Sequence, residues 1–167
     1  MRFVKIDQNN ECEFVKMYPQ YVQILQNYDS TISLPSEKNT RSRMNRSNSN
    51  VYLLQHEERY VGFIILGFGI TNSFSGHDMF IEEFYIKPEY QRKRLGSLAI
   101  IELIKTYPDC DFSAFIIENN QAARAFWENT FARCGYIERT QFGQIVAKCD
   151  NLLFKYWIKN NEESKYD

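Results

Sequence analysis

The sequence has little of what builds metal centres, disulfide scaffolds and membrane spans. Its four cysteines lie far apart without a C-x-x-C pair, and its two histidines, His56 and His77, have no ligand-like spacing. We therefore expect free thiols, surface histidines and no bound metal. The longest apolar run, residues 61–70, is interrupted by three glycines and is shorter than the roughly 18 residues of a membrane span. With no basic-then-apolar leader at its start, the chain is predicted to be a cytoplasmic protein.

An excess of charge of one sign is also missing. Twenty Lys and Arg residues against 21 Asp and Glu residues give a formal net charge of −1, which offers no general attraction to nucleic acid or to an anionic membrane. Basic residues cluster at 41–46 and 92–94, but no aromatic residues alternate with them as in nucleic-acid binders. We expect neither nucleic acid nor a membrane as a partner.

Apolar and aromatic side chains are plentiful instead. Hydrophobic residues make up 44% and aromatic residues 16% of the 167 residues, which is enough to build a packed core. We expect one domain over residues 1–159 and a frayed, charged tail over residues 160–167.

Periodicity and turn signals predict an order of elements. Strands are expected at residues 2–6, 51–54, 60–66, 79–87, 112–117, 135–137 and 152–158, the second and third forming a hairpin around Glu57 and Glu58. Helices are expected after residue 10, after residue 94 and over residues 120–133. Pro19 is a candidate break in the first helix, and the polar stretch 29–50 is expected to be a loop or short helices. The strand 112–117 is apolar enough to be buried on both faces. The order predicts an α/β (α+β) protein with a mixed sheet and helices on its faces.

The stretch from Ile81 to Tyr107 organises the rest of the chain. An apolar run ends at Ile86, passes through Pro88 into a basic turn at residues 90–94, and enters a segment with the apolar spacing of one helix face. A strand, a basic turn and a helix aim backbone N–H groups and the positive end of a helix dipole at an anion. The arrangement favours a phosphate or pyrophosphate, although a solvated basic turn has the same signature.

Two segments carry specific motifs, Gln91-Arg92-Lys93-Arg94-Leu95-Gly96 and residues 120–127. They resemble motifs of the GCN5-related N-acetyltransferases (GNAT). The first is similar to the family's acetyl-CoA signature, Q/R-x-x-G-x-G/A. The segment 120–127, NQAARAFW, resembles the family's N-x-x-A-x-x-[FL]-[YW] helix. The resemblance covers residues 50–145 and implies a GNAT-like, mostly antiparallel central sheet with helices on both faces.

The resemblance implies an acetyl-CoA-dependent N-acetyltransferase that acts on a primary amine of a small molecule or a peptide, without a metal, as a monomer or homodimer. Asn120 would hold the pantetheine arm of acetyl-CoA, cap its helix, or do both. The backbone N–H groups of three strand residues would pair with the same arm from the other side, and those of the basic loop would hold the pyrophosphate. These residues are Phe84, Tyr85 and Ile86 in the strand, and Gln91, Arg92, Lys93, Arg94, Leu95, Gly96 and Ser97 in the loop.

Two residues depart from the family pattern. Arg94 stands where the family usually has a glycine, so a left-handed backbone there would be strained, while its guanidinium can pair with phosphate oxygens. Trp127 stands where many members have the tyrosine that protonates the departing thiolate, and an indole cannot supply that proton. Tyr136, solvent, or no acid at all remain open, and Trp127 is expected to pack beside the cofactor arm.

Acetyl transfer needs a neutral amine, and Glu82 and Glu83 are the candidate bases. An alkylammonium has a pKa of about 10, so a base or a water relay helps at neutral pH. A regular strand places the two carboxylates on opposite faces, Glu82 with Phe84 and Ile86, and Glu83 with Tyr85. By the resemblance, Glu82 occupies one of the positions from which family members supply a base. A structural salt bridge for either residue, and the absence of any side-chain base, stay open.

A second function of a different class is a non-catalytic acyl-CoA-binding or regulatory module with the same fold, which the departures at Arg94 and Trp127 allow. The acceptor site would be built by the first helix, residues 29–50 and residues 70–77, whose sequences carry no specific signature. Residues 29–50 are equally well interpreted as a surface excursion.

Overall fold

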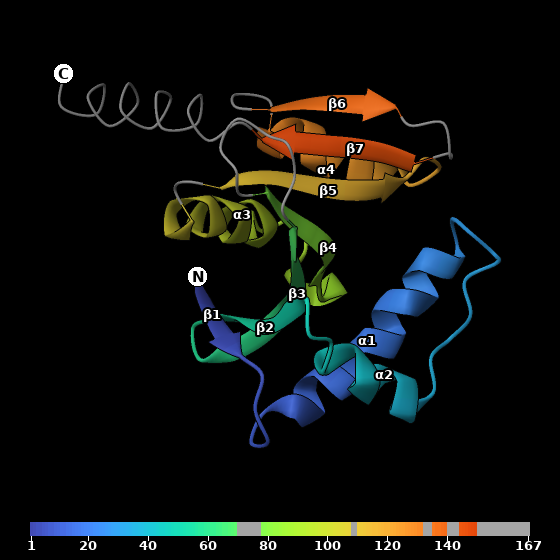
Figure 1. Ribbon diagram of the computed structural model, residues 1–167, viewed down its shortest axis with the longest axis vertical. Coiled ribbons are helices and arrows are strands. Elements are labelled where there is room, and N and C mark those ends of the chain that lie inside the picture. Colours follow the sequence, from blue (N-terminus) through green and yellow to red (C-terminus); the bar gives the residue numbers. More distant parts are fainter. Residues whose placement is uncertain (70–77, 108–109, 132–134, 140–143, 150–167) are drawn as a thin grey trace, which may run out of the picture. The chain divides into compact units, whose positions relative to one another are not determined.

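The computed structural model describes residues 1–69, 78–107, 110–131, 135–139 and 144–149 (Figure 1). The chain divides into two compact units. The first unit contains Met1–Phe68 and Ile81–Glu102, and the second contains Gly69–Phe80 and Leu103–Asp167. No helix in these described ranges is long and apolar enough to cross a membrane.

The first unit holds the strand order β1-β2-β3-β4 with two antiparallel pairings at its start, β1 with β2 and β2 with β3. Its elements are β1 (Arg2–Lys5), α1 (Glu11–Gln26), α2 (Glu37–Met44), β2 (Ser49–His56), β3 (Arg59–Gly69), most of β4 (Asp78–Ile86), the short 3-10 helix η1 (Pro88–Tyr90) and the first turns of α3 (Leu95–Thr106).

The hairpin between β2 and β3 turns on two residues, as the sequence predicts. Glu57 and Glu58 have φ values of 46° and 60°, the left-handed pair that a two-residue type I′ turn needs. A register shift between Leu54 and Gln55 lies just before the turn. The turn joins the strands tightly enough that His56 faces Arg59 directly.

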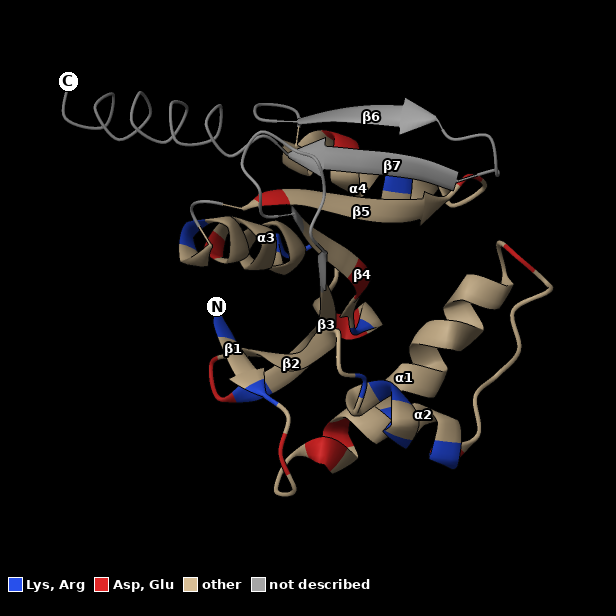
Figure 2. Ribbon diagram, in the orientation of Figure 1, with Lys and Arg blue, Asp and Glu red and all other residues tan. Residues whose placement is uncertain are grey.

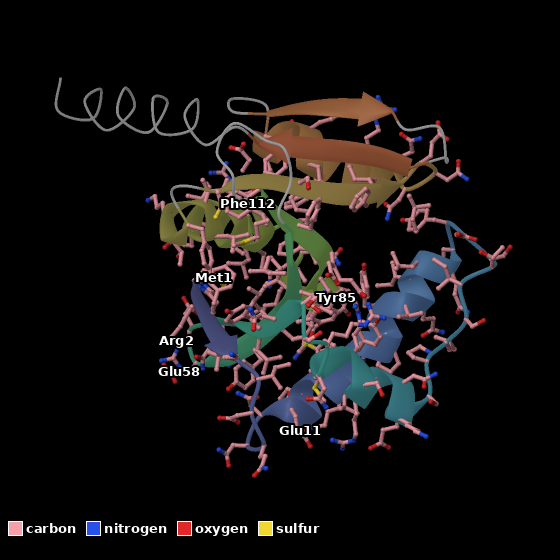
Figure 3. All side chains as sticks on the ribbon, in the orientation of Figure 1. Met1, Arg2, Glu11, Glu58, Tyr85 and Phe112 are labelled. Atoms are coloured by element: carbon pink, nitrogen blue, oxygen red, sulfur yellow. The ribbon has the colours of Figure 1, made fainter. Side chains whose placement is uncertain are left out.

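The core of the first unit lies between α1 and the strands. Phe14 and Met17 of α1 pack against alternate residues of the sheet: Val51, Leu53, Phe63, Ile65 and Tyr85. The rings of Phe14 and Phe63 meet edge to face, with centroids 4.9 Å apart, a geometry that stabilises beyond simple burial. Figure 3 shows Tyr85 pointing from β4 toward α1. The opposite set of residues, such as Ile64 and Leu66, is fully buried as well, so both faces of β3 are covered.

The first helix is continuous through Pro19, so the break that the sequence proposes there is wrong. The buried residues Phe14 and Met17 on one side of Pro19 and Val22 on the other all belong to the same helix. Most helix stability in a protein comes from packing an apolar face, and here that packing outweighs the one backbone hydrogen bond that proline removes.

The second unit holds the strand order β5-β7-β6, with both pairings antiparallel. Its elements are β5 (Asp111–Ile117), α4 (Gln121–Phe131), β6 (Gly135–Arg139) and β7 (Gln144–Cys149). The sequence does not predict β7, and the strand predicted at residues 152–158 lies outside the described residues.

Strand β5 is not buried on both faces as predicted. Phe115 is 50% exposed, and its ring stacks on that of Phe80 with centroids 6.4 Å apart. An apolar run alone therefore does not show that both faces of a strand are buried. A half-exposed aromatic side chain can be covered in part by a neighbouring ring, as Phe115 is by Phe80.

Two glycines of β3 differ in what surrounds them. A Cβ atom at Gly62 would overlap the backbone carbonyl oxygen of Tyr85 and lie 3.0 Å from Cα of Ile86, where β3 and β4 are joined by a 2.9 Å hydrogen bond from Lys87 N–H to Val61 C=O. The three atoms nearest to a Cβ at Gly67 would all belong to the flexible side chain of Glu82.

We predict that Gly62→Ala lowers the free energy of unfolding by about 2–3 kcal/mol, because the backbone of β4 must move to admit the methyl group. The matched variant Gly67→Ala should change it by no more than about 1 kcal/mol, because a side chain can turn aside. Urea unfolding followed by circular dichroism measures both. Equal effects of the two substitutions would contradict the close approach of β3 and β4 at Gly62.

Candidate active site

An arginine of α2 binds both candidate bases of β4. Nη2 of Arg43 donates to Oε2 of Glu82 at 2.6 Å and lies 2.8 Å from Oε1 of Glu83, and Nε of Arg43 donates to the same Glu83 oxygen at 2.8 Å. Figure 2 shows the acidic segment of β4 and the basic residues of α2, all of which belong to the first unit. Such charge-assisted, forked bonds fix both partners more firmly than single neutral ones do.

The two carboxylates converge instead of pointing apart. The hydroxyl of Tyr18 on α1 donates to Oε1 of Glu83 at 3.0 Å, while the carboxylate of Glu82 lies over Gly67 of β3. The expectation from a regular strand, opposite faces for Glu82 and Glu83, is therefore wrong for their carboxylates, which meet at one guanidinium nitrogen. The physical reason is charge, since two neighbouring carboxylates that share one cation are less repelled than two left unpaired.

The cluster of Arg43, Glu82 and Glu83 is largely shielded from water. The exposed fraction of the side chain is 10% for Arg43, 14% for Glu83 and 29% for Glu82. Burial raises the pKa of Glu83, and this outweighs the lowering by the charge and hydrogen bonds of Arg43 and by the Tyr18 hydroxyl. For Arg43, burial lowers the pKa, but the charge of Glu83 and the hydrogen bonds to both glutamates outweigh burial, so the pKa of Arg43 is raised. The guanidinium of Arg43 is therefore always charged. The carboxylate of Glu83 is a stronger base than an exposed glutamate, because burial raises its pKa.

Two tyrosines of α1 complete the surroundings of Glu83. Burial, followed by the nearby charge of Glu83, raises the pKa of Tyr18 to about 12, and the same two causes raise the pKa of Tyr21. Both phenols are thus protonated at neutral pH, and Tyr18 acts as a hydrogen-bond donor. The cluster then carries two carboxylates against one cation, an excess of one negative charge.

Some hydrogen-bonding atoms of the site have no partner among the described residues. Nη1 of Arg43 and the hydroxyl of Tyr85 are buried without one. Among the described residues, each carboxylate is bonded through a single oxygen, Oε2 of Glu82 and Oε1 of Glu83, so the second oxygen of each has no donor within that part of the chain. The arrangement can take a proton from, or bind, a cationic group.

The basic loop begins where β4 ends. The side-chain amide of Gln91 donates to the carbonyl of Ile86 at 2.8 Å and so closes the loop onto the strand. Arg94 C=O accepts the backbone N–H of Leu98 at 3.0 Å, which makes Arg94 the residue that opens α3. The ammonium of Lys93 lies 5.5 Å from the ring centroid of Tyr90, within the range of a cation–π contact.

Two arginines of this loop adopt left-handed backbone. Arg92 has a φ of 61° and Arg94 a φ of 62°, in the region that favours glycine. Sequence reasoning considers this geometry at Arg94, where the family has glycine, but does not anticipate it at Arg92. Both side chains are exposed, so the loop presents cations to solvent beside the first turn of a helix, whose N–H groups have no partner within the helix.

The other predicted residues are placed as follows. Tyr85, Ile86 and Leu95 are buried in the first unit, and Phe84, Gly96 and Ser97 are partly exposed. Asn120 and Trp127 belong to the second unit.

Asn120 and Trp127 have structural roles within that unit. Oδ1 of Asn120 accepts the N–H of Ala123 at 2.9 Å, which confirms that Asn120 caps α4. Trp127 is buried between the rings of Phe126 and Phe131, at 5.0 and 5.2 Å between centroids. Their predicted contacts with a cofactor remain predictions.

Sequence reasoning missed Arg43 and Tyr18. Arg43 lies in the basic cluster 41–46, which sequence analysis considers only as a possible nucleic-acid contact. A usable signal was the acidic pair itself, because two carboxylates on a largely buried strand require a cation nearby. Among the described residues, no group of three or more His, Cys, Asp and Glu side chains could hold a metal ion. His56 sits at the surface beside Glu57, and His77 lies outside those residues.

Solved structures of other proteins share this fold. One is an acetyltransferase from Thermus thermophilus (13% identity, 88% of this chain and 94% of that chain covered, TM-score 0.65). Another is the PaiA N-acetyltransferase of Thermoplasma acidophilum in complex with coenzyme A (14%, 89% and 98%, TM-score 0.58). A third is an aminoglycoside acetyltransferase from an uncultured soil metagenome, in complex with sisomicin (14%, 77% and 86%, TM-score 0.54).

No curated protein sequence matches the chain. A family model does, over residues 11–132. That segment contains the glutamate–arginine cluster, the basic loop and α4. Because the match extends over more than half of the sequence, the chain belongs to the acetyltransferase (GNAT) family.

Proposed function

We propose that this protein is an acetyl-CoA-dependent N-acetyltransferase that moves the acetyl group to a primary amine of a small molecule or a peptide. The observation that carries the proposal is a pair of carboxylates on β4, Glu82 and Glu83, which Arg43 of α2 binds. They lie in the same unit as the basic loop that leads into α3. A base and a pyrophosphate cradle on one strand–loop–helix segment are what amine acetylation needs.

The loop is the proposed cradle for the pyrophosphate of acetyl-CoA. Arg92, Lys93 and Arg94 are exposed and cationic, and the backbone enters α3 directly after them. The chemistry fits a pyrophosphate, because it combines exposed cations with helix N–H groups. Residues 84–86 are proposed to pair with the pantetheine arm. The cofactor contacts that the family resemblance implies for Asn120 and Trp127 remain predictions.

Glu82 is the proposed base, directly or through a water molecule. Its Oε1 atom has no hydrogen-bond donor among the described residues, and its side chain is the most exposed of the cluster, at 29%. Loss of a proton from the ammonium to this carboxylate frees the nitrogen lone pair to attack the thioester carbonyl carbon. The carbon–sulfur bond then breaks, its electron pair leaves on the CoA thiolate, and the second proton lost by the nitrogen neutralises that thiolate through solvent. Glu83 is the alternative base, because burial raises its pKa and makes it the better proton acceptor.

The excess negative charge of the cluster supports an amine as the acceptor. An ammonium group supplies N–H donors for the two open carboxylate oxygens and compensates the uncancelled charge. No protein acid is assigned for the departing thiolate, since Trp127 cannot supply a proton.

We also infer a cytoplasmic location, where an exposed free thiol such as that of Cys12 stays reduced.

A non-catalytic acyl-CoA-binding module is the second candidate, favoured by Trp127 in place of the tyrosine and by the left-handed Arg94.

We predict that acetyl-CoA raises the melting temperature, protects the backbone amides of residues 92–97 from hydrogen exchange and is consumed when a panel of primary amines is added. Release of free CoA thiol measures turnover. Binding without thiol release for any amine would support the module, and no binding would contradict both candidates.

We predict that Glu82→Gln lowers kcat/KM for the amine by about 100-fold, as expected for loss of a general base, and most strongly at low pH, where the amine is hardest to deprotonate. The affinity for acetyl-CoA should be unchanged. Gly67→Ala, which displaces the same carboxylate without removing it, should lower kcat/KM less, and the two substitutions should not be additive. A pH–rate profile of Glu82→Gln that matches the wild type would move the base role to Glu83 or to water.

We predict opposite effects of Arg94→Gly on stability and on binding. Stability should rise by about 1 kcal/mol, because glycine adopts a left-handed backbone without strain. The affinity for acetyl-CoA should fall, by up to about fivefold at low salt, because an exposed cation beside the pyrophosphate contributes about 1 kcal/mol or less. Arg92→Gly, at an equally left-handed position, is the matched variant. Tighter binding by Arg94→Gly at low salt would show that strain, not charge, dominates at this position.

A further inference from the structure

We propose that Arg43 is a positioning residue for the acetyl transfer: it holds the carboxylates of Glu82 and Glu83 together and leaves one oxygen of each for the acceptor amine. This inference rests on the proposed function, because it assigns a role to Arg43 in the activation of the amine. It concerns α2, a helix in the stretch 29–50, which the sequence allows equally as part of the acceptor site or as a surface excursion.

The geometry of the guanidinium allows this role. Its Nη2 atom reaches both carboxylates, at 2.6 Å and 2.8 Å, and its Nε atom adds a second bond to Glu83. A guanidinium is planar and presents its donors as a rigid fork. A lysine ammonium would supply the charge but not the fork, so the two chemistries can be separated by substitution.

The helix that carries Arg43 is itself anchored. Ser36 caps α2 by accepting the N–H of Asn39 at 3.2 Å, and the fully buried Thr40 donates its hydroxyl to Ser36 C=O at 3.1 Å. Arg41 bonds Glu11 at the start of α1. Arg43 therefore extends from a helix that is tied to α1, so the position of the guanidinium is set by the fold of the first unit.

Arg43 is the main group that favours the ionised form of Glu83 against the effect of burial. The groups that face Glu83 are Tyr18 and Tyr21 of α1, Glu82 of β4 and Arg43 of α2. Among these described groups Arg43 is the cation, and every other one is neutral or negative at neutral pH. Without it, burial and the neighbouring carboxylate would both favour a protonated Glu83. A protonated Glu83 offers the acceptor ammonium no negative charge beside the proposed base Glu82, and it cannot serve as the alternative base.

One atom of Arg43 shows that stability alone does not explain its position. Nη1 is buried without a partner among the described residues, and a buried, unpaired donor is unfavourable. A buried ion pair is in general weak support for stability. Features that disagree with local rules concentrate at functional sites, and this donor lies on the residue that contacts both candidate bases.

The experiment compares Arg43→Met and Arg43→Lys with Arg46→Met, which removes an exposed charge from the same stretch. One measurement is the side-chain carboxyl titration of Glu83 by ¹³C NMR, assigned with Glu83→Gln. The other is the pH profile of kcat/KM for the best amine of the panel, together with acetyl-CoA affinity. Proteins are compared as full chains.

Arg43→Met should raise the pKa of Glu83 further, because the cation that opposes the effect of burial is lost. The acid limb of the kcat/KM profile should then move to higher pH, and kcat/KM at neutral pH should fall at least about tenfold. Arg43→Lys should lie between Arg43→Met and the wild type, while Arg46→Met and all acetyl-CoA affinities should match the wild type. A role in folding alone would lower stability and leave the acid limb in place.

An unmoved acid limb in folded Arg43→Met, or in Arg43→Lys if the Met variant does not fold, would overturn the proposal. An unmoved Glu83 titration would overturn it as well. If the wild type acetylates no amine, the proposed function fails and the catalytic role of Arg43 with it. The titration then shows separately whether Arg43 controls the carboxylates, so the two failures are distinguishable.

Discussion

The first unit depends on one electrostatic constraint, the placement of two adjacent carboxylates on a largely buried strand. Burial opposes the charged form of Glu83 there, and the fold supplies a cation from α2, about 40 positions earlier in the chain. Meeting this constraint requires α2 to pack near β4 and α1 to supply a hydroxyl from Tyr18. Elements that are far apart in sequence thus meet at the charges of two neighbouring residues.

The basic loop holds two of its cationic residues in a strained backbone conformation. Arg92 and Arg94 occupy left-handed conformations that glycine would adopt freely, yet both positions carry a guanidinium. The loop is closed onto β4 by Gln91 and continued into α3 by the Arg94 carbonyl, so the strained residues are held from both sides. Strain of this kind persists only where the surrounding structure fixes it, and here it places cations beside a helix N-terminus.

The features that sequence alone predicts are those with a local cause. The hairpin at Glu57 and Glu58, the helix after the basic turn and the cap at Asn120 follow from turn chemistry, periodicity and capping. The features it misses have a tertiary cause. Pro19 stays within a helix because the helix packs, and Arg43 is identified as part of the site only through contacts about 40 residues away. Strand β7 escapes sequence reasoning because a short mixed-polarity segment carries little periodic signal.

The glycines of β3 connect the apolar run to the site. In the sequence, three glycines interrupt residues 61–70 and argue against a membrane span. In the structure, Gly62 lets the backbone of β4 approach at Tyr85, and Gly67 leaves the space that the carboxylate of Glu82 occupies. A side chain at the first position would push β4 away, and one at the second would turn Glu82 away from Arg43. The interruptions that weaken the apolar run are therefore what allow β3 to lie against a strand that carries two acids.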